Sequence, residues 1–146
     1  IEMGHVAGSE LDGRTISYDT SLEGLISKKK DFIGKRSLSR EAFTAEDRHK
    51  IVGVVPLDKK TSIPEGSHLV KDSNAPLPNP KLGYISASCW SVEYDNPFSL
   101  AILKDGKNMI GEKLFVMSPL KNKVIPVEIV SSHYVDPKGE RVRSWV

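Results

Sequence analysis

Residues 98–107 read FSLAILKDGK, an apolar run that ends in an Asp-Gly pair. Short runs of this kind, bounded by turn-forming residues, are typical of β-strands. Asp105-Gly106 is also the strongest short hairpin signal in the chain. The stretch therefore predicts a strand over residues 98–104 and a hairpin turn directly after it.

Five further stretches on either side of this run have the same character. Each is short, rich in β-branched or aromatic residues, and separated from the next by Gly, Pro, Asn or Asp. They cover residues 50–57, 67–71, 82–88, 113–117 and 124–131. Pro56 and Pro126 interrupt two of them and predict edge positions or bulges there. Because closure removes exposed edges, six short strands with little helix predict a small, closed antiparallel barrel.

The first 48 residues have a different composition, which is mixed and charged. A strand end and turn are expected around residues 11–13. Short helices are expected near residues 22–26, with Asp19 or Thr20 as N-cap, and over residues 35–43. The sequence thus predicts a mainly β chain with some α structure. An α+β segment, residues 1–48, precedes a six-stranded barrel, residues 49–146. A chain that begins at Ile1 is also expected to come from a longer protein.

Composition narrows the classes of function. The 146 residues carry 21 Lys plus Arg against 19 Asp plus Glu, and this net charge of +2 is too small to indicate a polyanionic partner by itself. No apolar run approaches the ~20 residues of a membrane-spanning helix, and from the first residues given we expect no secretory signal. The single cysteine, Cys89, rules out an internal disulfide, and we expect a half-buried, inert thiol in a cytoplasmic protein.

A search for catalytic and metal-binding patterns predicts neither in this chain. The four histidines lack any metal-ligand spacing, and no glycine-rich phosphate loop is present. Ser118 and Lys121 match the SxxK pattern of some serine acylases, but Pro119 between them favours a turn instead of the required helix. No residue is therefore assigned a catalytic or metal-binding role.

A basic stretch over residues 28–36, KKKDFIGKR, allows two interpretations. Lysines neutralise phosphates and Phe32 offers a stacking surface, which is typical of single-strand binding. The same residues also suit a solvated helix end followed by a turn, and the low net charge favours this second interpretation. A non-catalytic barrel that binds nucleic acid or protein remains the alternative function from the residues alone.

Several segments together resemble a known family. Residues 30–38, KDFIGKRSL, are similar to a signature of the folate-dependent aminomethyltransferases, which include the glycine cleavage T-protein and the C-terminal half of sarcosine oxidase alpha subunits. Other similar segments lie before and after this one, in the same order as in the family, at residues 1–5, 9–15, 83–88, 100–106, 111–116 and 136–141. The ending DPKGER, residues 136–141, resembles sarcosine oxidase alpha more than the T-protein.

The resemblance implies a fold and an activity. Family members have three domains around a central hole that holds tetrahydrofolate. Residues 1–48 would be the tail of the middle, folate-binding domain, and residues 49–146 the C-terminal barrel. The implied reaction is oxidative demethylation of sarcosine, with transfer of the one-carbon unit to tetrahydrofolate. Flavin and NAD would be bound by other parts of such an enzyme, and an aminomethyltransferase fragment is the alternative within the family.

The resemblance also implies which residues matter. The family's catalytic aspartate lies upstream of the residues matched here, so no catalytic residue is expected in this chain. Glu2 matches the glutamate of an Arg-x-Glu segment and is the one candidate for folate contact. The remaining domains of a longer chain and the other sarcosine oxidase subunits are the implied partners. We therefore expect the 146 residues alone to be inactive.

Overall fold

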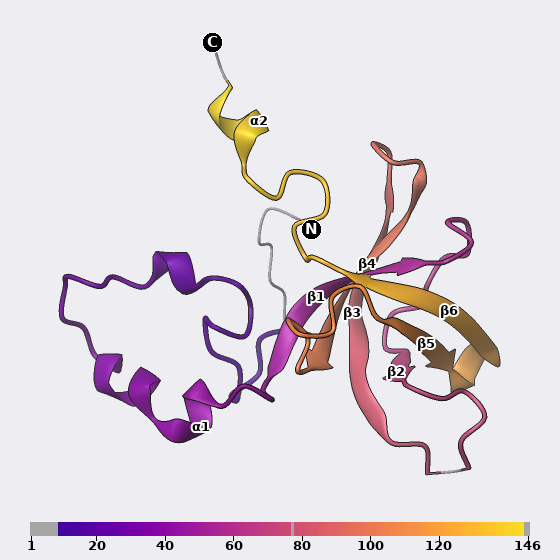
Figure 1. The fold of residues 1–146 in the computed structure, drawn as a ribbon, viewed down its shortest axis with the longest axis horizontal. Coiled ribbons are helices and arrows are strands. Elements are labelled where there is room, and N and C mark those ends of the chain that lie inside the picture. The colour runs from indigo at the N-terminus through magenta and orange to yellow at the C-terminus, as the bar shows by residue number, and fades with distance from the viewer. Residues whose placement is uncertain (1–8, 77, 145–146) are drawn as a thin grey trace.

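The computed structural model of the chain describes residues 9–76 and 78–144. Six strands form a closed antiparallel barrel in the order β1-β4-β3-β2-β5-β6 (Figure 1). Their bounds are β1 His49–Pro56, β2 His68–Val70, β3 Lys81–Ser91, β4 Asn96–Lys104, β5 Lys113–Ser118 and β6 Lys123–Val130. The mainly β prediction with a six-stranded barrel is confirmed, and each predicted strand overlaps an observed one.

The barrel interior is a single apolar core with contributions from every strand. Alternate residues point inward, so each strand places its branched aliphatic side chains on one face. The core includes Val52, Val54, Leu69, Ile85, Ala101, Leu103, Val116, Val127 and Ile129, each at most 1 % exposed. The core thus consists of residues far apart in the sequence, and their packing fixes the six strands relative to one another.

Strands β1 and β4 are buried on their outer face as well. A second cluster lies there, formed by Ile51, Val55, Phe98, Leu100 and Ile102, with Tyr134 packed against it. Tyr134 follows β6 and stacks on Phe98 with ring centroids 5.2 Å apart. Because both faces are covered, these two strands read as nearly continuous apolar runs instead of alternating ones.

The predicted hairpin at Asp105-Gly106 is wrong, because β4 pairs with β1 and β3 and not with β5. A turn does form, but the residues in and after it bond to the start of β1 and the end of β6. The Asp105 N–H donates to the Arg48 carbonyl over 3.1 Å, and the Gly111 N–H donates to the Ile129 carbonyl over 2.8 Å. The chain therefore crosses the end of the barrel, past β1 and β6, before it enters β5.

The two prolines also differ from the prediction of edges or bulges. A closed barrel has no edge strand, and the prolines lie instead where one ladder ends. The β1–β6 pairing stops at Pro56 opposite Val127, next to Pro126. Proline lacks the N–H needed to extend a ladder, so Pro126 accepts a bond from the Leu57 N–H over 3.0 Å but returns none.

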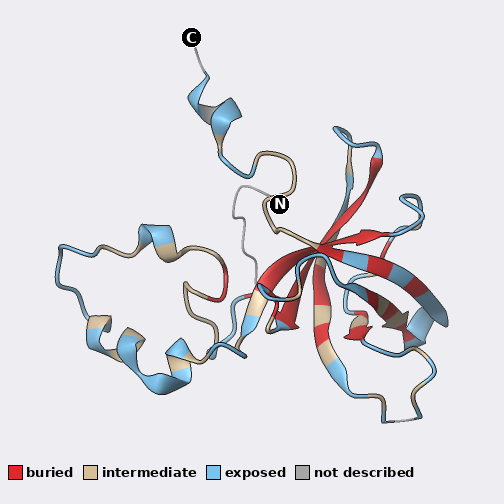
Figure 2. Cartoon of the chain, in the orientation of Figure 1, coloured by how far each residue is buried: buried red, intermediate tan, exposed pale blue. Residues whose placement is uncertain are grey.

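The described part of the segment before the barrel contains helical turns and no strand. The turns are η1 Glu23–Leu25, η2 Lys35–Ser39 and α1 Glu41–Thr44, and two more, η3 Pro119–Lys121 and α2 Glu140–Arg143, lie later in the chain. The expected turn near residue 12 is present, and residues 9–13, where the described chain begins, are not in a strand. Figure 2 shows the described segment before the barrel, residues 9–48, which we call the lobe, as largely exposed beside the buried strands. No helix among the described residues has the length and apolar character needed to cross a membrane.

Candidate functional site

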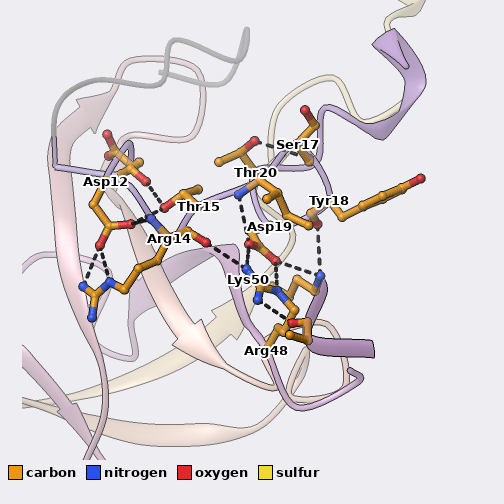
Figure 3. Close-up of polar contacts among 12 residues, drawn as sticks. Asp12, Arg14, Thr15, Ser17, Tyr18, Asp19, Thr20, Arg48 and Lys50 are labelled. Atoms are coloured by element: carbon orange, nitrogen blue, oxygen red, sulfur yellow. Dashed lines mark hydrogen bonds and ion pairs between the residues drawn. The ribbon is translucent and has the colours of Figure 1, made fainter. Parts of the chain in front are cut away.

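A buried carboxylate joins the segment before the barrel to strand β1 (Figure 3). The Asp19 side chain is 5 % exposed and accepts hydrogen bonds from Arg48, with Nε at 3.0 Å, and from Lys50, with Nζ at 3.0 Å. Its other neighbour is the Ile16 N–H at 3.1 Å. The Asp19 carbonyl in turn accepts the Ile51 N–H over 2.7 Å. We call Asp19, Arg48 and Lys50 the junction clamp.

The electrostatics of the clamp favour the ionised carboxylate. Burial by itself raises the pKa of Asp19, but hydrogen bonds from Arg48, Lys50 and the Ile16 backbone outweigh it, so the pKa lies below its ordinary value. Arg48 also donates to the carbonyls of Arg14, over 3.0 Å, and Ala42, over 2.7 Å. One guanidinium thereby holds three separate points of the segment before the barrel.

A second ion pair shapes the turn at Asp12. The Asp12 carboxylate accepts bonds from the Arg14 side chain, with Nε at 2.8 Å, from the Arg14 N–H at 2.9 Å and from the Thr15 hydroxyl at 2.9 Å. These bonds lower the pKa of the Asp12 carboxyl to about 2. The arrangement is an Asx turn whose charge is already satisfied inside the turn.

A cavity of about 560 Å³ opens between these two ion pairs and the outer face of the barrel. Its wall has three parts: the turn at Asp12, the start of β1, and the first half of β3 against β4. The lining residues are Asp12, Arg14, Thr15, Asp19, Arg48, His49, Lys81, Gly83, Tyr84 and Ile102. The volume lies within the range of small-molecule sites.

Tyr84 fixes the edge of the cavity nearest the start of the described chain. Its hydroxyl donates to the Ser9 carbonyl over 2.7 Å, and the Ser9 hydroxyl donates to the Ser86 carbonyl over 3.2 Å. Burial raises the pKa of Tyr84, and the nearby carboxylates of Asp12 and Glu10 add to the shift. The phenol therefore stays protonated and serves as a hydrogen-bond donor.

The charged groups of the cavity wall divide into paired and unpaired sets. Both acids are engaged, Asp12 with Arg14 and Asp19 with the clamp. Lys81 and His49 are exposed, and neither side chain has a hydrogen bond or ion pair within the described chain. The free donors of this wall are therefore basic, while no free carboxylate lines it.

The structure does not bring the described residues that the sequence singled out as site candidates into this cavity. Glu2, the folate-contact candidate, lies outside the described residues. Ser118 ends β5 and Lys121 lies in the short turn η3, as expected for a turn and not for a catalytic helix. The described residues contain no group of three or more His, Cys, Asp or Glu side chains suited to a metal ion. The basic stretch, residues 28–36, is mostly exposed in the lobe before the barrel.

Two expectations from sequence are corrected here. Cys89 is exposed, because it lies near the end of β3, where the β3–β4 hairpin runs past the core. Neither Asp19 nor Thr20 is the helix cap, since the residue before η1 is Leu22 and Asp19 bonds to Arg48 and Lys50. Sequence reasoning thus missed the clamp, whose one visible signal was an acid placed before a run of turns.

Curated relatives match nearly the whole chain. The chain is 38 % identical over 144 residues, 97 % of its length, to "Sarcosine oxidase subunit alpha" of Rhizobium meliloti (strain 1021). It is 35 % identical over 138 residues to the protein of the same name from Corynebacterium sp. (strain P-1). The chain spans about 14 % of the length of these curated relatives, and the homologous part is their C-terminal region.

A solved structure has the same fold. The glycine cleavage system aminomethyltransferase T of Bartonella henselae matches 92 % of this chain and 37 % of its own, with a TM-score of 0.67 and 17 % identity. At this identity the match concerns the fold alone. No protein-family model matches the sequence.

Proposed function

We propose that this chain, which is homologous to the C-terminal region of sarcosine oxidase alpha subunits, works as that region of a longer folate-dependent one-carbon enzyme. The observation that carries the proposal is the 38 % identity across 97 % of the chain. The proposed reaction is oxidative demethylation of sarcosine with transfer of the one-carbon unit to tetrahydrofolate. An aminomethyltransferase parent ranks second, because its support is a shared fold only.

Within that enzyme, the chain would divide at residue 48. Residues 1–48 would be the tail of the folate-binding domain and residues 49–146 the barrel domain. The segment before the barrel supports this division, because none of residues 21–47 is buried. Even its apolar side chains are exposed: Leu25 is 81 % exposed and Ile33 is fully exposed. Apolar side chains that find no core within their own segment are expected to pack on other parts of the protein. The remaining domains, and the other subunits, would supply that cover.

The described cavity wall offers no free carboxylate to the pterin end of tetrahydrofolate. The donor edge of a pterin ring suits a carboxylate partner, and both acids of the cavity wall are already engaged. Glu2 is the proposed folate contact of this chain, and the other pterin contacts would come from upstream of Ile1. Tetrahydrofolate would supply the nitrogens that capture the one-carbon unit.

The role of this chain would then be structural support of the site. The junction clamp fixes the segment before the barrel against β1, so that a wall of the folate site is held in place. Flavin and NAD would be bound by other parts of the enzyme. The chain by itself would be inactive, and the lone cysteine supports a cytoplasmic location.

A product assay tests this function. The full-length polypeptide, expressed with its partner subunits, is supplied with sarcosine, oxygen and tetrahydrofolate. We expect sarcosine to be consumed and 5,10-methylenetetrahydrofolate to accumulate. Consumption of sarcosine without any folate-bound product, or no consumption at all, would contradict the proposal.

A further inference from the structure

We propose that the junction cavity, defined by the lining residues given above, binds a carboxylate-bearing small molecule through Lys81 and His49. Lys81 begins β3 and His49 begins β1, so two strands that are separate in the sequence present basic side chains to one cavity. Neither side chain has a partner within the described chain. A ligand therefore displaces water from these two side chains, and no hydrogen bond between described residues has to break.

The charge of the wall favours an anion. The cavity is lined by three side chains with a formal positive charge, Arg14, Arg48 and Lys81, and by two acids, Asp12 and Asp19. The acids are neutralised by their own ion pairs, which leaves Lys81 as the surplus charge. A bound carboxylate would complete the balance and form charge-assisted hydrogen bonds.

The same wall disfavours a densely charged polyanion. Because both acids of the wall are paired, the single surplus positive charge can balance one carboxylate but not a chain of phosphates. Ile102 and Gly83 add apolar and backbone surface from the barrel to the lining. A carboxylate carried on an organic body matches this mixture of one free cation and apolar surface better than a phosphate chain does.

Two sources could supply such a ligand. One is the glutamyl end of a folate, which has carboxylates remote from the pterin ring; this source rests on the proposed function. The other is a free dicarboxylic acid that binds independently of folate. Glutarate represents the second source, and N-(4-aminobenzoyl)-L-glutamate represents the glutamyl end without the pterin.

Calorimetric titration of both probes into the full-length polypeptide tests the site at low salt. We expect both to bind, and Lys81→Gln to weaken binding at least about tenfold, as expected for loss of one charge-assisted hydrogen bond. Lys81→Arg should retain most of the affinity because it retains the charge. Lys113→Gln, an exposed lysine at the start of β5 outside the cavity lining, is the matched control and should change nothing.

The outcomes separate the two sources from failure. Tighter binding of the aminobenzoyl probe than of glutarate supports the glutamyl end, and equal binding supports a free dicarboxylate. Absence of binding by both probes, or an equal loss in Lys81→Gln and Lys113→Gln, would overturn the proposal. Because neither probe contains a pterin, such a failure leaves folate-dependent product formation as a separate result.

Discussion

Replacing Asp19 by Asn removes the charge of the junction clamp and keeps the size of the side chain. The Asp19 side chain is 5 % exposed, while those of Arg48 and Lys50 are 19 % and 13 % exposed. The substitution therefore leaves two largely covered cations without their common carboxylate. The segment before the barrel should then be held to β1 mainly by backbone bonds and by the remaining bonds of Arg48.

The size of the effect follows from two limits. Breaking a fully buried ion pair costs about 3–5 kcal/mol, and breaking an exposed one about 0–1 kcal/mol. The clamp lies nearer the buried limit, but Arg48 keeps the carbonyls of Arg14 and Ala42 as partners. We therefore expect a loss of about 2–3 kcal/mol in the free energy of unfolding. For a chain of this length, that corresponds to a fall in Tm of roughly 5–10 °C.

Urea and thermal unfolding, followed by circular dichroism, measure this loss, and Asp47→Asn is the matched control. Asp47 pairs with Lys104 over 3.4 Å, and their side chains are 70 % and 53 % exposed, so its loss should cost under about 0.5 kcal/mol. Amide exchange at Ile51, whose N–H donates to the Asp19 carbonyl, should accelerate only in Asp19→Asn. Equal stability of the two variants would refute the stabilising role that we assign to the junction clamp.

Two further predictions concern the backbone and the turn at Asp12. A Cβ on Gly83 would lie 2.1 Å from the Ile102 carbonyl oxygen, so Gly83→Ala should lose about 3 kcal/mol or more, whereas Gly13→Ala, with open space around it, should be near neutral in the same urea titration. The pKa of the Asp12 carboxyl is about 2, against an ordinary 3.8. The ionised carboxylate therefore stabilises the folded chain above pH 4, and this contribution is lost as the pH falls towards 2. Arg14→Gln should raise that pKa part of the way to 3.8 by carboxyl NMR titration, and an unchanged value would contradict the assigned ion pair.

The strands were predictable from the sequence because their signal is local. Alternation, β-branched residues and turn-forming residues lie within each segment, and the six predicted strands overlap the six observed. The pairing of those strands depends on contacts between distant residues. Gly106 illustrates this: the sequence suggests a hairpin turn, but a Cβ there would lie 2.8 Å from Val52, so the glycine allows the close approach of this turn to β1.

The candidate site was less visible in the sequence for the same reason. Asp19 and Arg48 are 29 positions apart, and no motif relates two such residues before the fold is known. Lys81 and His49 become neighbours in one cavity only because β3 and β1 flank β4. The family resemblance, in contrast, was carried by short segments in a fixed order, and the homology to sarcosine oxidase alpha subunits confirms it.

We propose that this chain forms part of a tetrahydrofolate site that needs residues outside it. Calorimetric titration of tetrahydrofolate into two samples tests it most directly: the 146-residue chain, and the full-length polypeptide with its partner subunits. We predict binding to the full-length protein and none to the chain alone. No binding to the full-length protein would contradict the account.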